Sequence, residues 1–111
     1  MVAACFAKGL SVFENVGELR IKETDRVKSM LVNLTKMGAK IRVVKSKGQE
    51  NIIIKGVKKL TGAKVSSFGD HRTAMSMLIA GLAAQGRTSL DDISCINKSF
   101  PNFLKTLNRL I

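Results

Sequence analysis

Three stretches of the chain repeat hydrophobic residues at the spacing of an α-helix. In the first stretch, the hydrophobic positions that share one face are Val27, Met30, Leu31 and Leu34. The polar positions expected on the opposite face are Lys28, Ser29, Asn33 and Lys36. Thr24 is a suitable N-cap and Gly38 a natural stop, so we expect the helix to lie between them.

The other two predicted helices lie in the second half of the chain. Asp70 is expected to cap a segment that runs to Gly86 and is hydrophobic on nearly all sides, which predicts that it is buried. Its main apolar positions are Ala74, Met75, Leu78, Ile79 and Leu82. A short last helix is expected to be capped by Ser99, with Pro101 in its first turn. Its inward positions are Phe103, Leu104, Leu107 and Leu110.

Short strands are predicted between these helices. Residues 40–45 alternate, with Ile41 and Val43 on one face, and residues 51–55 return after a turn at 46–49. Further short strands are expected at residues 10–15, around Val65 and at 87–91. The alternation of helices and strands predicts a fold that combines both kinds of element.

Two of these strands belong to an apparent internal repeat. Residues 2–16 and 79–93 align without gaps, and each copy predicts a helix end, a glycine stop and a strand. The copies contain Ala7-Lys8-Gly9-Leu10-Ser11 and Ala84-Gln85-Gly86-Arg87-Thr88. Chance similarity of two helix-to-strand joints is the simpler alternative. If the repeat is real, the first copy has only the end of its helix, so we expect a truncated chain.

The composition favours one compact domain that attracts anions. The 111 residues are 45% hydrophobic and carry a net charge of +11, with a mean hydropathy of +0.10 and a pI near 10.2. A positive field attracts nucleic acid, acidic membranes or phosphorylated small molecules. Without Trp or Tyr, and with five Phe that are not interleaved with basic residues, the chain lacks a stacking platform, which disfavours nucleic acid.

Membrane and metal functions are not expected. No apolar stretch approaches the roughly 18 residues that span a bilayer. Cys5 and Cys95 lie in apolar company without motif spacing, which is typical of reduced thiols in a cytoplasmic protein. One histidine and two distant cysteines cannot form a zinc site, so we expect no metal.

Three short motifs each place a basic residue at the start of a predicted helix. They occupy residues 22–26, 69–75 and 97–103. Their basic residues at or beside the first turn are Arg26, Arg72 and Lys98. Because the helix dipole disfavours positive charge there, an anion shared by these cations would offset the cost.

Each of these residues also has an ordinary structural explanation. Arg26 can pair with Glu23 or Asp25 at the surface, which stabilises by roughly 0 to 1 kcal/mol. His71 is more often a structural hydrogen bonder, and Lys98 alone says little in a lysine-rich chain. The combination of one carboxylate, Glu23, with several cations at helix starts nevertheless favours acid–base chemistry on an anionic substrate.

In order and interval, the motifs resemble those of EPSP synthases (3-phosphoshikimate 1-carboxyvinyltransferases). The matching stretches are Glu18-Leu19-Arg20-Ile21-Lys22-Glu23-Thr24-Asp25-Arg26, Gly69-Asp70-His71-Arg72-Thr73-Ala74-Met75 and Lys98-Ser99-Phe100-Pro101. The resemblance covers essentially the whole chain and identifies it as a C-terminal part of such an enzyme. It implies an α+β fold of βαβαββ repeat units with helices packed on mixed sheets. Residues 1–16 would end one unit, and residues 17–111 would form the following unit and the C-terminal helix.

The resemblance also implies a reaction. Such enzymes transfer the enolpyruvyl group of phosphoenolpyruvate to the 5-hydroxyl of shikimate 3-phosphate and release phosphate, without a metal or organic cofactor. The route leads to chorismate and the aromatic amino acids. By resemblance, Lys22 would contact shikimate 3-phosphate and act in catalysis with Glu23, which would handle the proton at the methylene carbon. The residues that would bind phosphoenolpyruvate are Arg26, Arg72 and Lys98, and those that would support the site are Asp70 and His71.

The chain departs from the family pattern in what it lacks. An Asp expected earlier in this lobe and the site residues of the other lobe are missing, and Glu18 stands where some members have a substrate-binding Asn. We therefore expect little or no activity from the chain alone and a need for the missing N-terminal portion as a partner. Alternatives are a fragment of the sibling transferase that acts on UDP-N-acetylglucosamine, a free-standing basic module for nucleic acid or another polyanion, and an inactive remnant kept for protein interaction.

Overall fold

The computed structural model describes residues 1–22, 24–99 and 102–110, with residues 97–99, 108 and 110 described by their backbone alone. The helical elements are the 3₁₀ turns η1 (Ala3–Cys5) and η2 (Gly17–Ile21) and the helices α1 (Arg26–Lys36), α2 (His71–Ala83), α3 (Ser94–Ser99) and α4 (Phe103–Leu110). The strands are β1 (Leu10–Phe13), β2 (Lys40–Ser46), β3 (Gln49–Lys55), β4 (Lys64–Val65) and β5 (Ser89–Leu90). The mixture of helices and strands confirms the expected α+β class.

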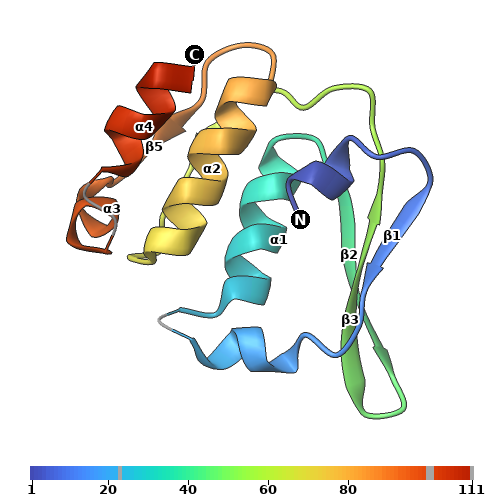
Figure 1. Cartoon of the computed structure of the whole chain (residues 1–111). Coiled ribbons are helices and arrows are strands. Elements are labelled where there is room, and N and C mark those ends of the chain that lie inside the picture. Colours follow the sequence, from blue (N-terminus) through green and yellow to red (C-terminus); the bar gives the residue numbers. More distant parts are fainter. Residues whose placement is uncertain (23, 100–101, 111) are drawn as a thin grey trace.

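The strands form two separate sheets. The larger sheet has the order β1-β3-β2 and is antiparallel throughout, whereas β4 and β5 pair in parallel. Lys47 and Gly48 have φ values of 51° and 77°, which gives the β2–β3 hairpin the left-handed backbone of a tight two-residue turn. Helix α1 lies along one face of the larger sheet, and α2 lies beside α1 (Figure 1).

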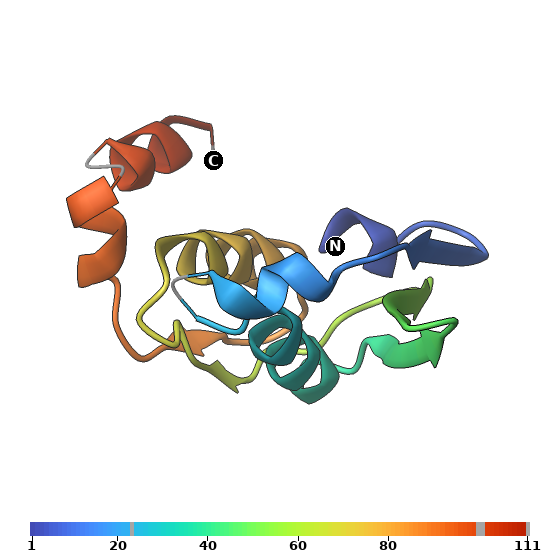
Figure 2. The same ribbon diagram turned by 90° about the horizontal axis from the view of Figure 1, so that it is seen from below.

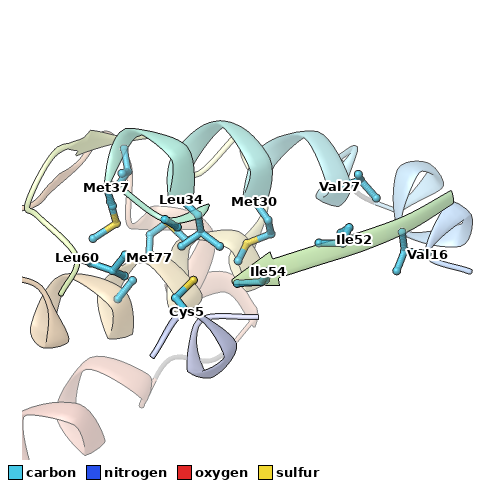
Figure 3. Packing of buried hydrophobic residues seen from close by; sticks show 13 residues of the cluster. Cys5, Val16, Val27, Met30, Leu34, Met37, Ile52, Ile54, Leu60 and Met77 are labelled. Atoms are coloured by element: carbon cyan, nitrogen blue, oxygen red, sulfur yellow. The ribbon is translucent and has the colours of Figure 1, made fainter. Parts of the chain in front are cut away.

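The core lies between α1, the sheet and α2. Leu34 and Met30 of α1 approach Ile54 of β3, and Met77 of α2 and Leu60 extend the cluster away from the sheet (Figure 3). Full burial of one such side chain stabilises the fold by roughly 1.5–3 kcal/mol. The core therefore fixes α1 against both the sheet and α2.

Helices α1 and α2 begin at the same end of the molecule (Figure 1). Helices α3 and α4 lie on the side of α2 away from the larger sheet (Figure 2). In the part of the chain that the structure describes, no helix is long and apolar enough to cross a membrane. The common end of α1 and α2 brings two of the three sequence motifs together.

Two predictions about α1 are wrong in detail. Asp25, not Thr24, is the N-cap, because its carboxylate accepts a hydrogen bond from the amide of Lys28 at 3.0 Å. Ser29 and Asn33 are fully buried rather than exposed on a polar face, because α2 and the segment before it cover that side of the helix. The predicted stop is confirmed, since Gly38 adopts φ 88° and lets Ala39 donate to the carbonyl of Leu34.

Two predictions about the second half also need correction. Helix α2 is not buried on all sides, because Ile79 and Leu82 are 41% and 51% exposed. Ser99 is the last residue of α3, a helix that periodicity did not reveal, and α4 begins only at Phe103. Pro101 lies outside the described residues.

The two copies of the apparent repeat share their turn. Gly9 and Gly86 have φ values of 84° and 87°, and each precedes a short strand. The first copy opens with a 3₁₀ turn, Ala3–Cys5, and the second with the end of an α-helix. The proposed boundary between units at residues 16 and 17 stays a prediction.

Candidate active site

A buried ion pair joins the first turns of α1 and α2. Arg26, the first residue of α1, donates from Nε to Oδ2 and from Nη2 to Oδ1 of Asp70, both at 3.0 Å. The side chain of Arg26 is 11% exposed and that of Asp70 is not exposed at all. This parallel two-bond geometry fixes the plane of the guanidinium as well as its position. Arg26 therefore has a buried partner 44 residues away, which the neighbouring residues in the sequence did not suggest.

Asp70 also caps α2, as predicted. Its Oδ2 accepts hydrogen bonds from the amide and the hydroxyl of Thr73, at 3.1 and 2.8 Å. Burial alone would raise the pKa of the Asp70 carboxyl, but the hydrogen bonds from Arg26 and Thr73 outweigh it and hold this pKa at about 2. Asp70 is therefore a carboxylate at neutral pH and compensates the charge of Arg26.

Buried polar side chains brace the same junction. The hydroxyls of Ser29 and Thr73 lie 3.0 Å apart between α1 and α2. Asn33 donates to the carbonyl of Ser66 at 2.7 Å and accepts from its amide at 2.9 Å. The sequence did not reveal that these residues support the site, because periodicity along α1 carries no signal of a polar partner 33 or 44 residues away.

A surface hollow of about 180 Å³ opens beside the two helix starts. Its lining residues are Met1, Leu19, Arg26, Met30, Arg72, Thr73 and Ser76. Arg72 is exposed and has no ion-pair partner among the residues that the structure describes. The hollow therefore brings together two of the predicted anion-binding residues, one compensated by Asp70 and one not.

The other predicted site residues whose side chains the structure describes are not among those that line the hollow. Lys22 is exposed at the end of η2, next to the segment that leads into α1. Nδ1 of His71 lies 3.9 Å from Oδ1 of Asp70, too far for a hydrogen bond. Glu23 lies outside the described residues, and Lys98 belongs to α3, where only the backbone is described.

A second ion-pair cluster holds the segment in front of α1. Arg20 donates to both carboxylate oxygens of Glu50 in β3, with the shortest bond 2.7 Å from Nη2 to Oε2. Its Nη1 also donates to Oδ2 of Asp25 at 2.7 Å. Sequence reasoning quoted Arg20 as part of a motif but gave it no role.

The described residues contain no group of three His, Cys, Asp or Glu side chains that could hold a metal ion. What the hollow offers chemically is a pair of guanidinium groups at the ends of two helices. Such a site suits a small anion with a phosphate or carboxylate group.

Comparison with known proteins decides the family. The family model of EPSP synthase (3-phosphoshikimate 1-carboxyvinyltransferase) matches residues 1–107. The chain belongs to the EPSP synthase family. Among curated relatives, the chain is 50% identical over 110 residues to the 3-phosphoshikimate 1-carboxyvinyltransferase of Geotalea uraniireducens. The matched residues cover 99% of this chain and 25% of the relative. The corresponding protein of Geobacter sulfurreducens is 47% identical over 109 residues, with 98% and 24% covered.

Solved structures agree. An EPSP synthase from Acinetobacter baumannii superposes with a TM-score of 0.82 and 34% sequence identity, covering 97% of this chain and 25% of that one. The family resemblance and the EPSP synthase fold read from the motifs are therefore confirmed. The chain spans about a quarter of the length of these EPSP synthases.

Proposed function

We propose that this chain forms part of the active site of a 3-phosphoshikimate 1-carboxyvinyltransferase. In that reaction the 5-hydroxyl of shikimate 3-phosphate loses its proton as its oxygen bonds to C2 of phosphoenolpyruvate, while C3 gains a proton. Loss of a proton from C3 and of inorganic phosphate from C2 then yields the enolpyruvyl ether. No metal or organic cofactor takes part in the proposed reaction.

The observation that carries the proposal is the hollow that Arg26 and Arg72 share. Asp70 fixes the guanidinium plane of Arg26 through two hydrogen bonds. A phosphate or carboxylate of phosphoenolpyruvate would meet Arg26 and Arg72 in one place, which stabilises charge as phosphate departs.

The remaining roles follow the family motifs. Lys22 would contact shikimate 3-phosphate, and Glu23, the next residue in the sequence, would add and remove the proton at the methylene carbon. Lys98 would bind phosphoenolpyruvate, and Asp70 and His71 would be supporting residues near the substrate phosphate. The exposure of Lys22 supports its part of this assignment.

The missing N-terminal portion of the enzyme is the proposed partner. Arg72, Met75, Ile79 and Leu82 fall on one stripe of α2, at the spacing of a single helix face. The last two are exposed apolar side chains, which favours a macromolecular contact along this stripe. A partner that covered the stripe would end over Arg72 and close the hollow. A cytoplasmic location belongs to the same proposal and agrees with the free thiols of Cys5 and Cys95.

The test is phosphate release from phosphoenolpyruvate and shikimate 3-phosphate. We expect little or none with the chain alone and turnover when the N-terminal portion of a related EPSP synthase is added. Glu23→Gln and Arg72→Met should each abolish most of this turnover. Arg42→Met removes the same charge as Arg72→Met, from an exposed position of strand β2, and should leave turnover unchanged.

Substrate binding tests the same proposal without turnover. Shikimate 3-phosphate and phosphoenolpyruvate should shift amide NMR signals at the first turns of α1 and α2, and Arg72→Met should weaken the effect of phosphoenolpyruvate. A folded chain that neither binds these compounds nor gains activity on mixing would contradict the proposal. Strongly salt-dependent binding of arbitrary DNA in their place would favour the polyanion-binding alternative.

A further inference from the structure

Arg20 ties together three separate parts of the fold. It lies in the last turn of η2, bonds Glu50 of β3 through Nε and Nη2, and bonds Asp25 at the start of α1 through Nη1. A single guanidinium uses two of its edges for two different carboxylates, which a lysine ammonium cannot reproduce with the same geometry.

Arg20 and Asp25 lie on either side of the segment that contains Lys22. Arg20 precedes Lys22 by two residues, and Asp25 follows it by three. The bond between Arg20 and Asp25 therefore closes a short loop that contains Lys22. The bond to Glu50 anchors this loop to the sheet, where the Glu50 carbonyl also accepts the amide of Val16 at 2.9 Å.

The loop depends on its ends for its position. Ile21 is 80% exposed, and Lys22 is exposed and has no bonded partner in the described part of the chain. Neither side chain is held by packing against the core. Asp25, by contrast, is fixed twice, because one oxygen caps α1 through Lys28 while the other receives Arg20.

The ionisation of the cluster agrees with this geometry. Hydrogen bonds from Arg20 are the main cause that lowers the pKa of Glu50. Burial acts to raise the pKa of Asp25, but the hydrogen bonds from the Lys28 amide and from Arg20 lower it overall. Both carboxylates are therefore charged at neutral pH, and the cluster carries a net charge of one negative unit rather than attracting a substrate anion itself.

We propose that Arg20 is a positioning residue that holds Lys22 beside the Arg26–Asp70 junction. Its effect on substrate rests on the proposed function, in which Lys22 contacts shikimate 3-phosphate. Its effect on the loop does not, so the two can be tested separately.

The test uses the 111-residue chain labelled with ¹⁵N. The amides of Leu19 and Lys28, which flank the loop, donate to the Val16 carbonyl and the Asp25 carboxylate. Arg20→Gln should raise their hydrogen exchange about five- to tenfold, as loss of one or two partly exposed ion pairs implies. Exchange in the core strand β3 at Ile52 and Ile54 should change less than twofold. The same variant should weaken shikimate 3-phosphate binding about five- to tenfold, while Arg42→Gln, with the same loss of charge, should change neither quantity.

Three further variants test whether the bonding geometry of Arg20, rather than its charge or the N-cap of α1, holds the loop. Asp25→Asn keeps an N-cap oxygen for Lys28 but removes the carboxylate that Arg20 bonds, and should reproduce the local loosening in part. Glu50→Gln should do the same from the sheet side. Arg20→Lys keeps the charge but should still show faster exchange, because a lysine ammonium cannot bond Glu50 and Asp25 through two fixed edges.

Each outcome decides one claim. Unchanged exchange at Leu19 and Lys28 in Arg20→Gln, or full recovery in Arg20→Lys, would overturn the positioning role. If exchange rises but substrate affinity stays at the wild-type value, Arg20 holds the loop without positioning Lys22 for substrate, and the inference fails. If the wild-type chain binds no shikimate 3-phosphate and gains no activity with the N-terminal portion of a related enzyme, the proposed function fails, while the exchange data still decide whether Arg20 holds the loop.

Discussion

Arg26 and Asp70 face each other with two parallel hydrogen bonds of 3.0 Å, although 44 residues separate them. The pair fastens the start of α1 to the start of α2, because Asp70 is also the N-cap of α2. Arg26 is thus held in place by the fold before any anion arrives. That arrangement reduces the ordering that a substrate would have to impose on the side chain.

Replacing Asp70 by Asn should destabilise the chain by about 3 kcal/mol, because Arg26 loses a buried carboxylate while the asparagine oxygen still caps α2. Urea unfolding followed by circular dichroism measures the change. Glu14→Gln removes an exposed carboxylate and should change the free energy of unfolding by less than about 0.5 kcal/mol. Equal effects of the two substitutions on the free energy of unfolding would show that the buried ion pair stabilises the fold no more than an exposed carboxylate does.

The pH dependence should reflect the same carboxylate. The pKa of Asp70 is about 2 in the folded chain, below its ordinary value of 3.8. The unfolded chain therefore binds the proton more readily, so this stabilisation is fully present above about pH 4 and is lost as the pH falls toward 2. Asp25, Glu50 and Asp91 have lowered pKa values as well and act in the same direction. Urea midpoints between pH 6 and pH 2.5 should fall less steeply in Asp70→Asn than in the wild type, and parallel curves would contradict the assignment to Asp70.

Asn33 should be more important for stability than its polar character suggests. It is fully buried and satisfies both the amide and the carbonyl of Ser66. Asn33→Leu keeps four branched side-chain heavy atoms but leaves both backbone groups unpaired and adds bulk, and should cost about 2–4 kcal/mol in urea unfolding. Thr35→Ala changes an exposed position on the same helix and should stay within about 0.5 kcal/mol. A small loss in Asn33→Leu would mean that Ser66 finds other partners.

The sequence predicted local structure better than it predicted contacts across the fold. The β2–β3 hairpin, the glycine end of α1 and the Asp70 cap were all predicted, because each depends on residues that are close in the chain. Ser29 and Asn33 were misplaced, because a polar residue on a helix looks solvent-exposed unless its distant partner is known. The family motifs marked Arg26 and Asp70 as functional, but only the three-dimensional arrangement reveals that they bond each other.

Gly56 should tolerate no side chain. A Cβ at this position would overlap the carbonyl oxygen of Ala7. The two backbone segments cannot easily move apart, because the amide of Val57 donates to the carbonyl of Cys5 at 2.7 Å. Gly56→Ala should destabilise by about 2–4 kcal/mol or prevent folding. Gly17→Ala is the matched control, since a Cβ there meets nothing within 4 Å and the residue needs no left-handed backbone. Thermal unfolding of both variants distinguishes them, and a folded Gly56→Ala with wild-type stability would mean that the β3 end can shift.

The exposed stripe of α2 should govern association. Ile79 and Leu82 are 41% and 51% exposed, so replacing both by Ser removes about half of the burial of each side chain. The double variant should lower the free energy of unfolding by about 1.5–3 kcal/mol and leave the chain folded. It should weaken binding of the N-terminal portion of a related EPSP synthase about tenfold or more, as measured by calorimetry, and should reduce self-association in analytical ultracentrifugation. Leu10→Ser and Val12→Ser together change two apolar residues of β1 that are 65% and 52% exposed, and provide the control. If the β1 pair weakened the complex and the α2 pair did not, the partner would cover the sheet and leave the Arg72 end of the hollow open.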